Sequence, residues 1–268
     1  MTMMNFTLYK QGIKGSWKML LIFFAVLTLY VSMIISMFDP EKIALLDEYV
    51  RMMPEIMAAV GMTAGAATLL GFISSYLYGF ILIVFPMVFS ILYGNKLIAG
   101  YVDRGSMTYL LAAPVKRRTV AFTQMKVLVT GILALVLYIT ILELSISEAT
   151  FPGKLEISKL LILNFGLLCL HLFTGGICFF CSCLFSDMKY SVGFGAGIPA
   201  LEFIIQMLSN TGEQVENVKY ATYFTLFNPE GIIKGEGSAI AGVITLFIGA
   251  IIVYSVAIVV FSKKDLHI

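Results

Sequence analysis

The sequence has few charged side chains. Only 13% of its 268 residues are Asp, Glu, Lys or Arg, whereas soluble domains contain about 25%. Hydrophobic residues make up 59% of the chain, which is more than a soluble core of this size can hide. The composition excludes a soluble enzyme, a nucleic-acid-binding protein and a disordered chain. It predicts an all-α polytopic membrane protein.

Motifs that carry enzyme chemistry are missing as well. The chain contains no G-x-x-x-x-G-K-[ST] phosphate-binding loop, no H-E-x-x-H zinc motif and no G-x-S-x-G turn. Its four cysteines do not indicate a disulfide framework in a lipid-embedded protein. Cys169, Cys181 and Cys183 do not share one helical face with each other, so we expect neither a metal site near His171 nor a bound cofactor.

Long apolar runs supply the membrane spans. A helix crosses a bilayer with about 20 apolar residues. Six spans are expected, at residues 19–38, 70–95, 121–144, 160–184, 190–210 and 238–262. We expect Lys126 and Glu143, near the two ends of the third span, to snorkel towards the interfaces. The charge-free run 56–95 could hold one span or two, and the basic residues decide between these alternatives.

Basic residues gather in alternate connections. With one span in 56–95, one side holds 12 of the 18 basic residues and three acids, and the opposite side holds six basic residues and 12 acids. The positive-inside rule assigns the basic side to the cytoplasm. We therefore predict six spans in the plasma membrane with both termini cytoplasmic. The expected contacts of the basic residues are lipid headgroups and not nucleic acid.

Two connections have the pattern of surface helices. In residues 1–18, apolar side chains recur at spacings of three and four and lysines at spacings of four, so this segment is expected to lie in the inner interface. Outside, Asp39 and Pro40 have the order of a helix cap and a first helical residue. Pro54 would break or kink that helix. The Gly/Ala-rich stretch 61–71 would let helices approach closely.

The loop 101–114, on the predicted cytoplasmic side, contains another short helix. Gly105 and Ser106 can start it, with Ser106 as its cap, and Pro114 ends it. Its apolar side chains are Met107, Tyr109, Leu110 and Leu111. We expect a helix parallel to the bilayer that presents these side chains to the cytoplasm, where they require a complementary surface on a partner.

This loop resembles that of the type-2 ABC exporter permeases. In that family an acidic stretch, a Gly-Thr/Ser pair, a hydrophobic helix with paired leucines, a proline and a basic residue follow the second span. The matching residues here are Asp103, Gly105, Ser106, Leu110, Leu111, Pro114 and Arg117. The ending 261–266 also resembles the family's usual end. Tyr101 departs from the pattern because an acid is common there, so the partner contacts are expected to differ in detail.

The resemblance implies that ATP hydrolysis and the membrane pathway belong to different subunits. A separate ATP-binding cassette subunit would bind ATP and Mg and hydrolyse the ATP, so this chain would not itself be an enzyme. The helix at about 105–113 would dock on that subunit as the coupling helix, with Met107 and Tyr109 joining the matching residues. Two permease chains, identical or related, would assemble with two ATPase chains. ATP-driven closure of the ATPases would then shift the spans and change access to the pathway.

The resemblance also implies a substrate class. The run 105–114 looks most like the small permeases that export antimicrobial or toxin peptides, the phenol-soluble modulin exporters among them. It therefore implies export of an amphipathic or hydrophobic peptide. Hydrophobic drugs are the first alternative, and a cation such as sodium is the second.

Glu202 lies near the middle of the fifth span, with Gln206 one turn further on. A central acid costs about 2.5–3.5 kcal/mol on insertion scales, so it should face protein or water. Both residues are candidates for the translocation pathway, and a protonatable Glu202 leaves a secondary transporter as a more distant alternative. The other interpretation is a structural hydrogen bond to another span, to Asn164 or to His171. The aromatic segment 213–236 is either an anchoring belt or a re-entrant segment.

Overall fold

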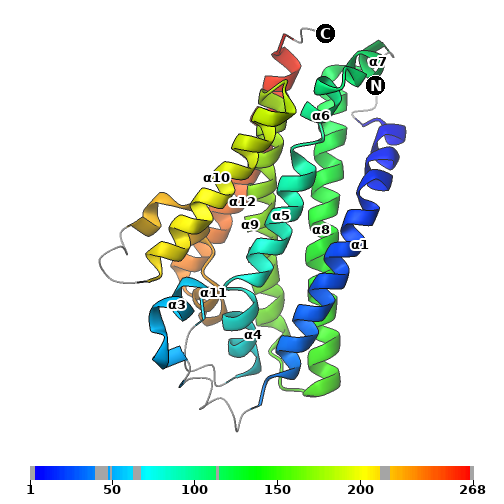
Figure 1. Ribbon diagram of the computed structural model, residues 1–268. Helices are drawn as coiled ribbons and strands as arrows, with labels where there is room; N and C mark the ends of the chain where they lie inside the picture. The colour runs from blue at the N-terminus through cyan, green and yellow to red at the C-terminus, as the bar shows by residue number, and fades with distance from the viewer. Residues whose placement is uncertain are drawn as a thin grey trace.

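The structure is a computed structural model that describes residues 4–39, 48, 50–62, 68–112, 115–211 and 218–265. Every regular element in these ranges is a helix (Figure 1). The elements are α1 (Phe6–Ser36), α3 (Pro54–Ala59), α4 (Leu69–Leu77), α5 (Ile81–Gly94), α6 (Ala99–Asp103), α7 (Ser106–Ala112), α8 (Arg117–Thr150), α9 (Ile157–Leu184), α10 (Met188–Ser209), η2 (Tyr223–Leu226), α11 (Pro229–Lys234) and α12 (Gly237–Lys263).

Six helical segments of the described chain are long and apolar enough to cross a membrane, which confirms the predicted number. They are Phe6–Ser36, Ile81–Asp103, Arg117–Thr150, Ile157–Leu184, Met188–Ser209 and Gly237–Lys263. Because the number is even, α1 begins and α12 ends at the same end of the bundle. The short helices α6 and α7 lie at that end too, and α3, α4 and α11 lie at the other (Figure 1).

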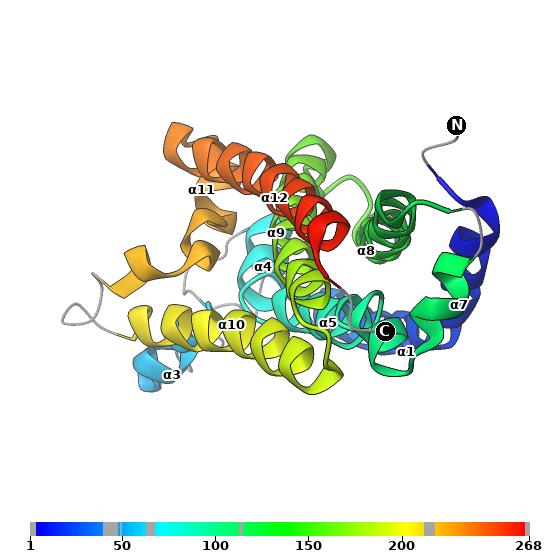
Figure 2. The ribbon, with the colours of Figure 1, turned by 90° about the horizontal axis from the view of Figure 1, so that it is seen from above.

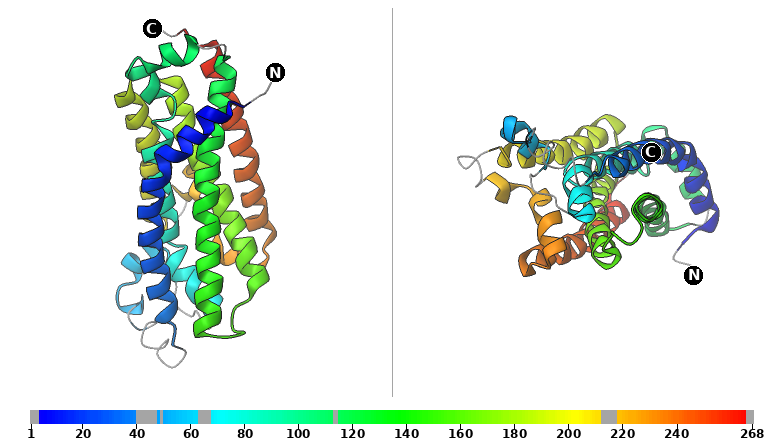
Figure 3. Two further views of the ribbon diagram at one scale, coloured as in Figure 1. Left: turned by 90° about the vertical axis from the view of Figure 1, so that its right-hand side faces the viewer. Right: turned by 90° about the horizontal axis from the view of Figure 1, so that it is seen from below.

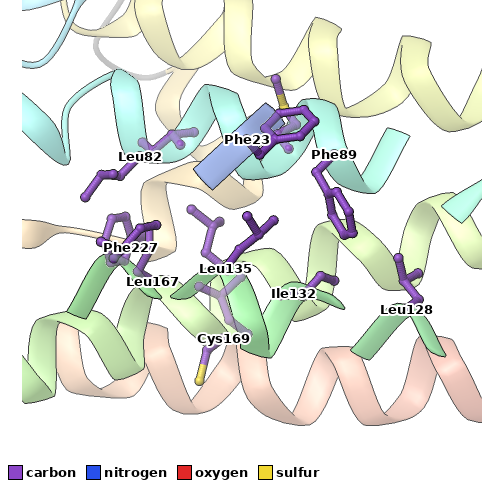
Figure 4. Packing of buried hydrophobic residues seen from close by; sticks show 14 of the residues in the cluster. Phe23, Leu82, Phe89, Leu128, Ile132, Leu135, Leu167, Cys169 and Phe227 are labelled. Atoms are coloured by element: carbon purple, nitrogen blue, oxygen red, sulfur yellow. The ribbon is translucent and has the colours of Figure 1, made fainter. Parts of the chain in front are cut away.

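The bundle is built around α9. This helix packs against α5, α8, α10 and α12 (Figure 2). In its most apolar stretch 67% of the residues are buried, compared with 22% in α1 and in α10. These two outer helices therefore offer most of their apolar surface to lipid or to a partner. The core between the helices includes Phe89, Ile132 and Leu167 (Figure 4).

Helix α1 joins two segments that the sequence suggested separately, 1–18 and 19–38. It runs without a break and begins where the Asn5 side chain accepts a hydrogen bond from the N–H of Leu8 at 3.0 Å. Its N-terminal part leans away from the axis of the rest (Figure 3). That part is tied to the bundle, because Tyr93 Oη donates to the carbonyl of Gly12 at 2.6 Å.

The second span differs from the continuous helix expected at 70–95. The chain forms α4, turns, and starts again as α5. At the turn, Gly79 meets Gly61 backbone to backbone: a Cβ on Gly79 would lie 2.5 Å from the carbonyl oxygen of Val60 and 2.9 Å from the Cα of Gly61. The stretch 61–71 was expected to bring helices together, but the contact at Gly61 joins two turns, and residues 63–67 are not described. The φ of Gly61, +73°, also suits glycine.

The surface helix expected after Asp39 falls largely outside the described residues, since 40–47 and 49 are not described. Its later part is interrupted at Met53, which has φ −132° and ψ 60°, and α3 begins at Pro54. The predicted break at Pro54 is therefore confirmed. Proline suits this first helical position because it needs no N–H there.

Glu143 corrects the expectation for the third span, because its side chain is fully buried and does not snorkel. Helix α8 continues to Thr150. Its 34 residues measure roughly 50 Å, compared with a hydrocarbon thickness of about 30 Å. Glu143 consequently lies inside the helix and not at its end. Its Oε2 accepts hydrogen bonds from Tyr78 Oη at 3.0 Å and from Asn164 Nδ2 at 2.7 Å.

Candidate functional site

Helices α6 and α7 form a corner at the end of the bundle where α1 begins. Gly105 makes the turn with φ +67°, and its N–H donates to the carbonyl of Val102 at 2.9 Å. Ser106 is the first residue of α7, and its hydroxyl donates to the carbonyl of Tyr101 at 3.1 Å. This bond from α7 back to α6 holds the corner. Tyr101, the position that departs from the family pattern, contributes a backbone atom to it.

The apolar residues of α7 point to different surroundings. Met107 is fully buried and anchors the helix on the bundle. Leu110 and Leu111 are half-buried against the core. Tyr109 is 84% exposed. Of the apolar side chains expected to meet a partner, Tyr109 is therefore the one that α7 presents fully.

Two polar contacts tie this corner to the neighbouring spans. Asp103 Oδ1 accepts a hydrogen bond from the N–H of Met188 at 3.4 Å, at the start of α10. Arg117 Nη1 donates to the carbonyl of Lys264 at 2.6 Å, at the end of α12. Pro114, the residue expected to end the short helix, lies outside the described residues. Asp103 and Arg117 thus make contacts inside the chain, and Gly105 and Ser106 shape the corner.

A basic groove of about 540 Å³ opens beside α7. Its lining residues are Leu111, Val115, Lys116, Arg117, Arg118 and Ser262. Three positive side chains around one groove attract an anionic surface, either an acidic protein patch or lipid phosphate. The neighbouring Lys264 is partly buried at the end of α12, and this burial lowers the pKa of its ammonium group.

The other end of the bundle contains a cavity of about 350 Å³. It lies between α3 and α4 on one side and α10 with the η2–α11 segment on the other. Apolar rings and polar side chains share its wall, among them Phe203, Phe224, Phe227, Gln206, Asn210 and Lys219. A ligand with both an apolar and a polar part matches such a lining.

Glu202 and Gln206 both bind the segment between α10 and α12. Glu202 Oε2 accepts a hydrogen bond from the backbone N–H of Tyr223 at 3.1 Å. Gln206 Oε1 accepts one from the hydroxyl of Thr225 at 2.6 Å. Of the two, Gln206 lines the cavity. The contact of Glu202 favours a structural hydrogen bond, although its partner is Tyr223 and not Asn164 or His171.

Most aromatic residues of the segment before α12 turn inwards. Tyr223 and Phe224 of η2 are buried, and the hydroxyls of Tyr223 and Thr174 lie 3.1 Å apart. Gly242 lets α12 approach this segment, since a Cβ there would overlap the carbonyl oxygen of Leu226. Tyr220, just before η2, is 79% exposed. Helix η2 and Phe227 are therefore packed into the bundle, while Tyr220 remains at the surface. Packing of this kind shields irregular backbone in membrane proteins.

The polar residues of α9 have other partners than the sequence suggested. His171 Nε2 lies 2.8 Å from the carbonyl oxygen of Leu82, and Asn164 donates to Glu143. The site around Glu143 was missed from the sequence. A signal was present, because Glu143 and Ser147 are one turn apart and Asn164 is a polar residue in the next span.

The cysteines of α9 are buried free thiols. Among the residues that the structure describes, no three His, Cys, Asp or Glu side chains are grouped so that they could hold a metal ion. Cys178 instead donates its S–H to the carbonyl of Gly195 at 3.2 Å, between α9 and α10. No protein-family model, curated protein or solved structure matches the chain.

Proposed function

We propose that the chain is the membrane-spanning permease subunit of an ATP-driven exporter of the type-2 ABC family. Helix α7 acts as the coupling helix and docks on a separate ATPase subunit, which holds ATP and Mg. Two permease chains, identical or related, assemble with two ATPases in the plasma membrane. Both termini and α7 are cytoplasmic. The exporter moves amphipathic or hydrophobic peptides out of the cell.

The exposure of Tyr109 is the observation that carries this proposal. The ring is 84% exposed on a helix that Met107 fixes to the bundle. Tyrosines combine a large rigid contact area with a hydrogen-bonding tip, and they are enriched among the residues that dominate binding at protein interfaces. An aromatic side chain held outwards at the end of the spans suits insertion into a groove of a partner.

The hydrogen bonds at this end supply a path from α7 to the spans. The hydroxyl of Ser182 in α9 accepts hydrogen bonds from the N–H groups of Ile98 and Ala99, both at 3.0 Å. It also donates to the carbonyl of Asn95 at 2.9 Å. It therefore joins α9 to the connection that leads into α6. Asp103 and Arg117 join the same end to α10 and α12. A push on α7 would reach three spans through these contacts.

The basic groove supports the cytoplasmic assignment of α7. Lys116, Arg117 and Arg118 lie beside the helix, and positive residues accumulate on the cytoplasmic side of membrane proteins. They also allow acidic residues of an ATPase to bind next to Tyr109. Electrostatic attraction of this kind speeds association and fixes its orientation.

A drug-sized amphipathic molecule is the second candidate substrate. The cavity of about 350 Å³ falls within the range of roughly 300–1,000 Å³ of small-molecule pockets. A longer peptide would need more room, which the exposed apolar face of α10 could provide at a contact with a second permease chain. A secondary transporter that uses Glu202 is less favoured, because this carboxylate binds the backbone of Tyr223.

Isolation of the intact complex tests the proposal. The full chain, carrying an affinity tag, is purified from its native membrane in a mild detergent, and the proteins that accompany it are identified. We expect an ATPase with a phosphate-binding loop in equimolar amount, and ATP hydrolysis that amphipathic peptides stimulate. Recovery of the chain without an ATPase, while a known ABC complex from the same membrane keeps its own, would reject the proposal and favour the secondary transporter.

A further inference from the structure

A buried polar cluster lies between α4, α8 and α9. It consists of Tyr78, Glu143, Ser147 and Asn164, and we call it the Glu143 cluster. Glu143 and Ser147 are fully buried, and Asn164 is 3% exposed. Tyr78 Oη and Asn164 Nδ2 both donate to Glu143 Oε2. One carboxylate oxygen thus joins the end of α4 to two long helices.

Three oxygens of the Glu143 cluster have no hydrogen-bond partner among the described residues. They are Glu143 Oε1, Asn164 Oδ1 and Ser147 Oγ. Asn164 Oδ1 belongs to the amide that contacts the carboxyl group, and Ser147 lies one turn from Glu143 on the same face of α8. The Asn164 oxygen therefore belongs to a group in contact with Glu143, and Ser147 stands one helical turn away. Buried polar atoms without a partner are rare and call for a donor or an ion.

No positive side chain compensates Glu143 within the described residues. Tyr78 from the end of α4 and Asn164 from α9 are the groups that act on its carboxyl. The other helices packed on α8, which are α1, α5 and α12, bring no described Lys, Arg, His, Asp or Glu into contact with it. A buried carboxylate with neutral neighbours alone is very costly. One proton would remove this charge.

We propose that Glu143 is a proton-binding site that exchanges its proton with the cavity past Tyr78. Uptake forms an O–H bond between Glu143 Oε1 and a proton that a hydronium ion in the cavity delivers, which leaves a water molecule there, and release reverses this step. The new hydroxyl donates to Asn164 Oδ1, whose amide already contacts the carboxyl group, and so supplies that oxygen with its missing partner. Tyr78 keeps its own proton in both states and donates to Oε2.

Tyr78 connects the Glu143 cluster to the cavity. Tyr78 is fully buried, it is one of the residues that line the cavity, and its hydroxyl contacts Glu143 Oε2. Ionised Glu143 would draw water towards the carboxylate, and Tyr78 would have to move to admit it. The protonation state of Glu143 is thus linked to how tightly the end of α4 is held on α8 and α9. This inference needs no partner subunit and stands apart from the proposed export function.

Infrared spectroscopy of the full chain in lipid nanodiscs tests the inference. At neutral pH we expect a C=O stretching band of a protonated carboxyl group that shifts in D₂O. Glu143→Gln should remove this band completely. The matched control is Glu148→Gln on the same helix, where the carboxylate is exposed and its loss should leave the band unchanged.

Two further measurements test the hydrogen bond from Tyr78 and whether the site holds a proton or a sodium ion. Tyr78→Phe should shift the band to higher frequency, because the C=O group loses the hydrogen bond from Tyr78. Replacement of potassium by sodium in the buffer should leave the band unchanged. The inference is overturned if the wild-type band is absent, if it survives Glu143→Gln, or if sodium abolishes it, since the site would then hold a sodium ion.

Discussion

Glu202 of α10 accepts a hydrogen bond from the backbone N–H of Tyr223 at 3.1 Å. The bond joins a side chain from the interior of one span to the first residue of η2, where the chain is not α-helical. Backbone N–H groups in such a segment need partners because lipid offers none. A carboxylate that costs free energy on insertion thus has a structural use in holding the segment before α12.

Replacement of Glu202 by alanine should destabilise the protein by about 1–3 kcal/mol, the usual cost of leaving a buried donor unpaired. Glu202→Gln should keep most of the stability, because its amide oxygen can accept the same hydrogen bond. Both variants are compared with the wild type by thermal unfolding in one detergent. Equal losses in Glu202→Ala and Glu202→Gln would show that the negative charge matters, and would revive a transport role for Glu202.

Tyr109→Ala should separate partner binding from folding. Because the ring is exposed, the stability of the isolated chain should change by less than about 0.5 kcal/mol. Binding to the ATPase should weaken by roughly 30-fold or more, which corresponds to a loss of about 2 kcal/mol at an interface hot spot. The measurement is co-purification of the two subunits together with a titration of their affinity.

The control for Tyr109→Ala is Tyr220→Ala. Tyr220 is 79% exposed at the other end of the bundle, so its loss removes a similar aromatic surface without touching α7. We expect this control to bind the ATPase normally. If both variants bind as the wild type does, α7 is not the docking helix. If both weaken binding, the effect is not specific to α7.

Met107→Ala should act on stability instead. Met107 is the fully buried residue of α7, and truncation of a buried methionine to alanine costs about 2–5 kcal/mol. Met52→Ala is the matched control, because Met52 is 65% exposed and its removal should cost little. Denaturant unfolding compares the two variants. Similar small losses would contradict the anchoring role assigned to Met107.

The sequence predicted the number of spans well, because length and hydropathy reflect the bilayer itself. It did not predict the break in the second span, which was expected to be continuous over 70–95. The run that includes Gly79 is free of charge, and the break coincides with a contact to Gly61, which is too distant in sequence for a local pattern to reveal it. Glu143 was misplaced for a related reason. A charge near the end of an apolar run reads as an interface residue unless its buried partners, Tyr78 and Asn164, are known.

The candidate docking surface was predicted only as a segment. The spacing of Met107 and Tyr109 placed both on one short helix, but which of them faces the bundle depends on how α6 and α7 meet at Gly105. Glu202 and Gln206 were recognised because polar residues stand out in an apolar span. Their partners Tyr223 and Thr225 were not, since the fold of the connecting segment brings them there.

The contact between Gly61 and Gly79 is open to a direct test by Gly79→Ala. A Cβ on Gly79 would lie 2.5 Å from the carbonyl oxygen of Val60, an atom of the backbone that cannot rotate away. Overpacking of this kind costs about 1–3 kcal/mol. Since both glycines line the cavity, the variant should also change its shape. We expect a lower unfolding temperature than that of the wild type in the same detergent.

Gly197→Ala provides the opposite case. Gly197 lies inside α10, and a Cβ there would meet nothing within 4 Å. Alanine is favoured over glycine in a helix interior by about 1 kcal/mol, so this variant should be as stable as the wild type or slightly more stable. The difference between the two substitutions isolates the effect of the backbone contact from that of helix propensity. If Gly79→Ala were no less stable than Gly197→Ala, the two segments would not meet at Gly61, and the break in the second span would need another cause.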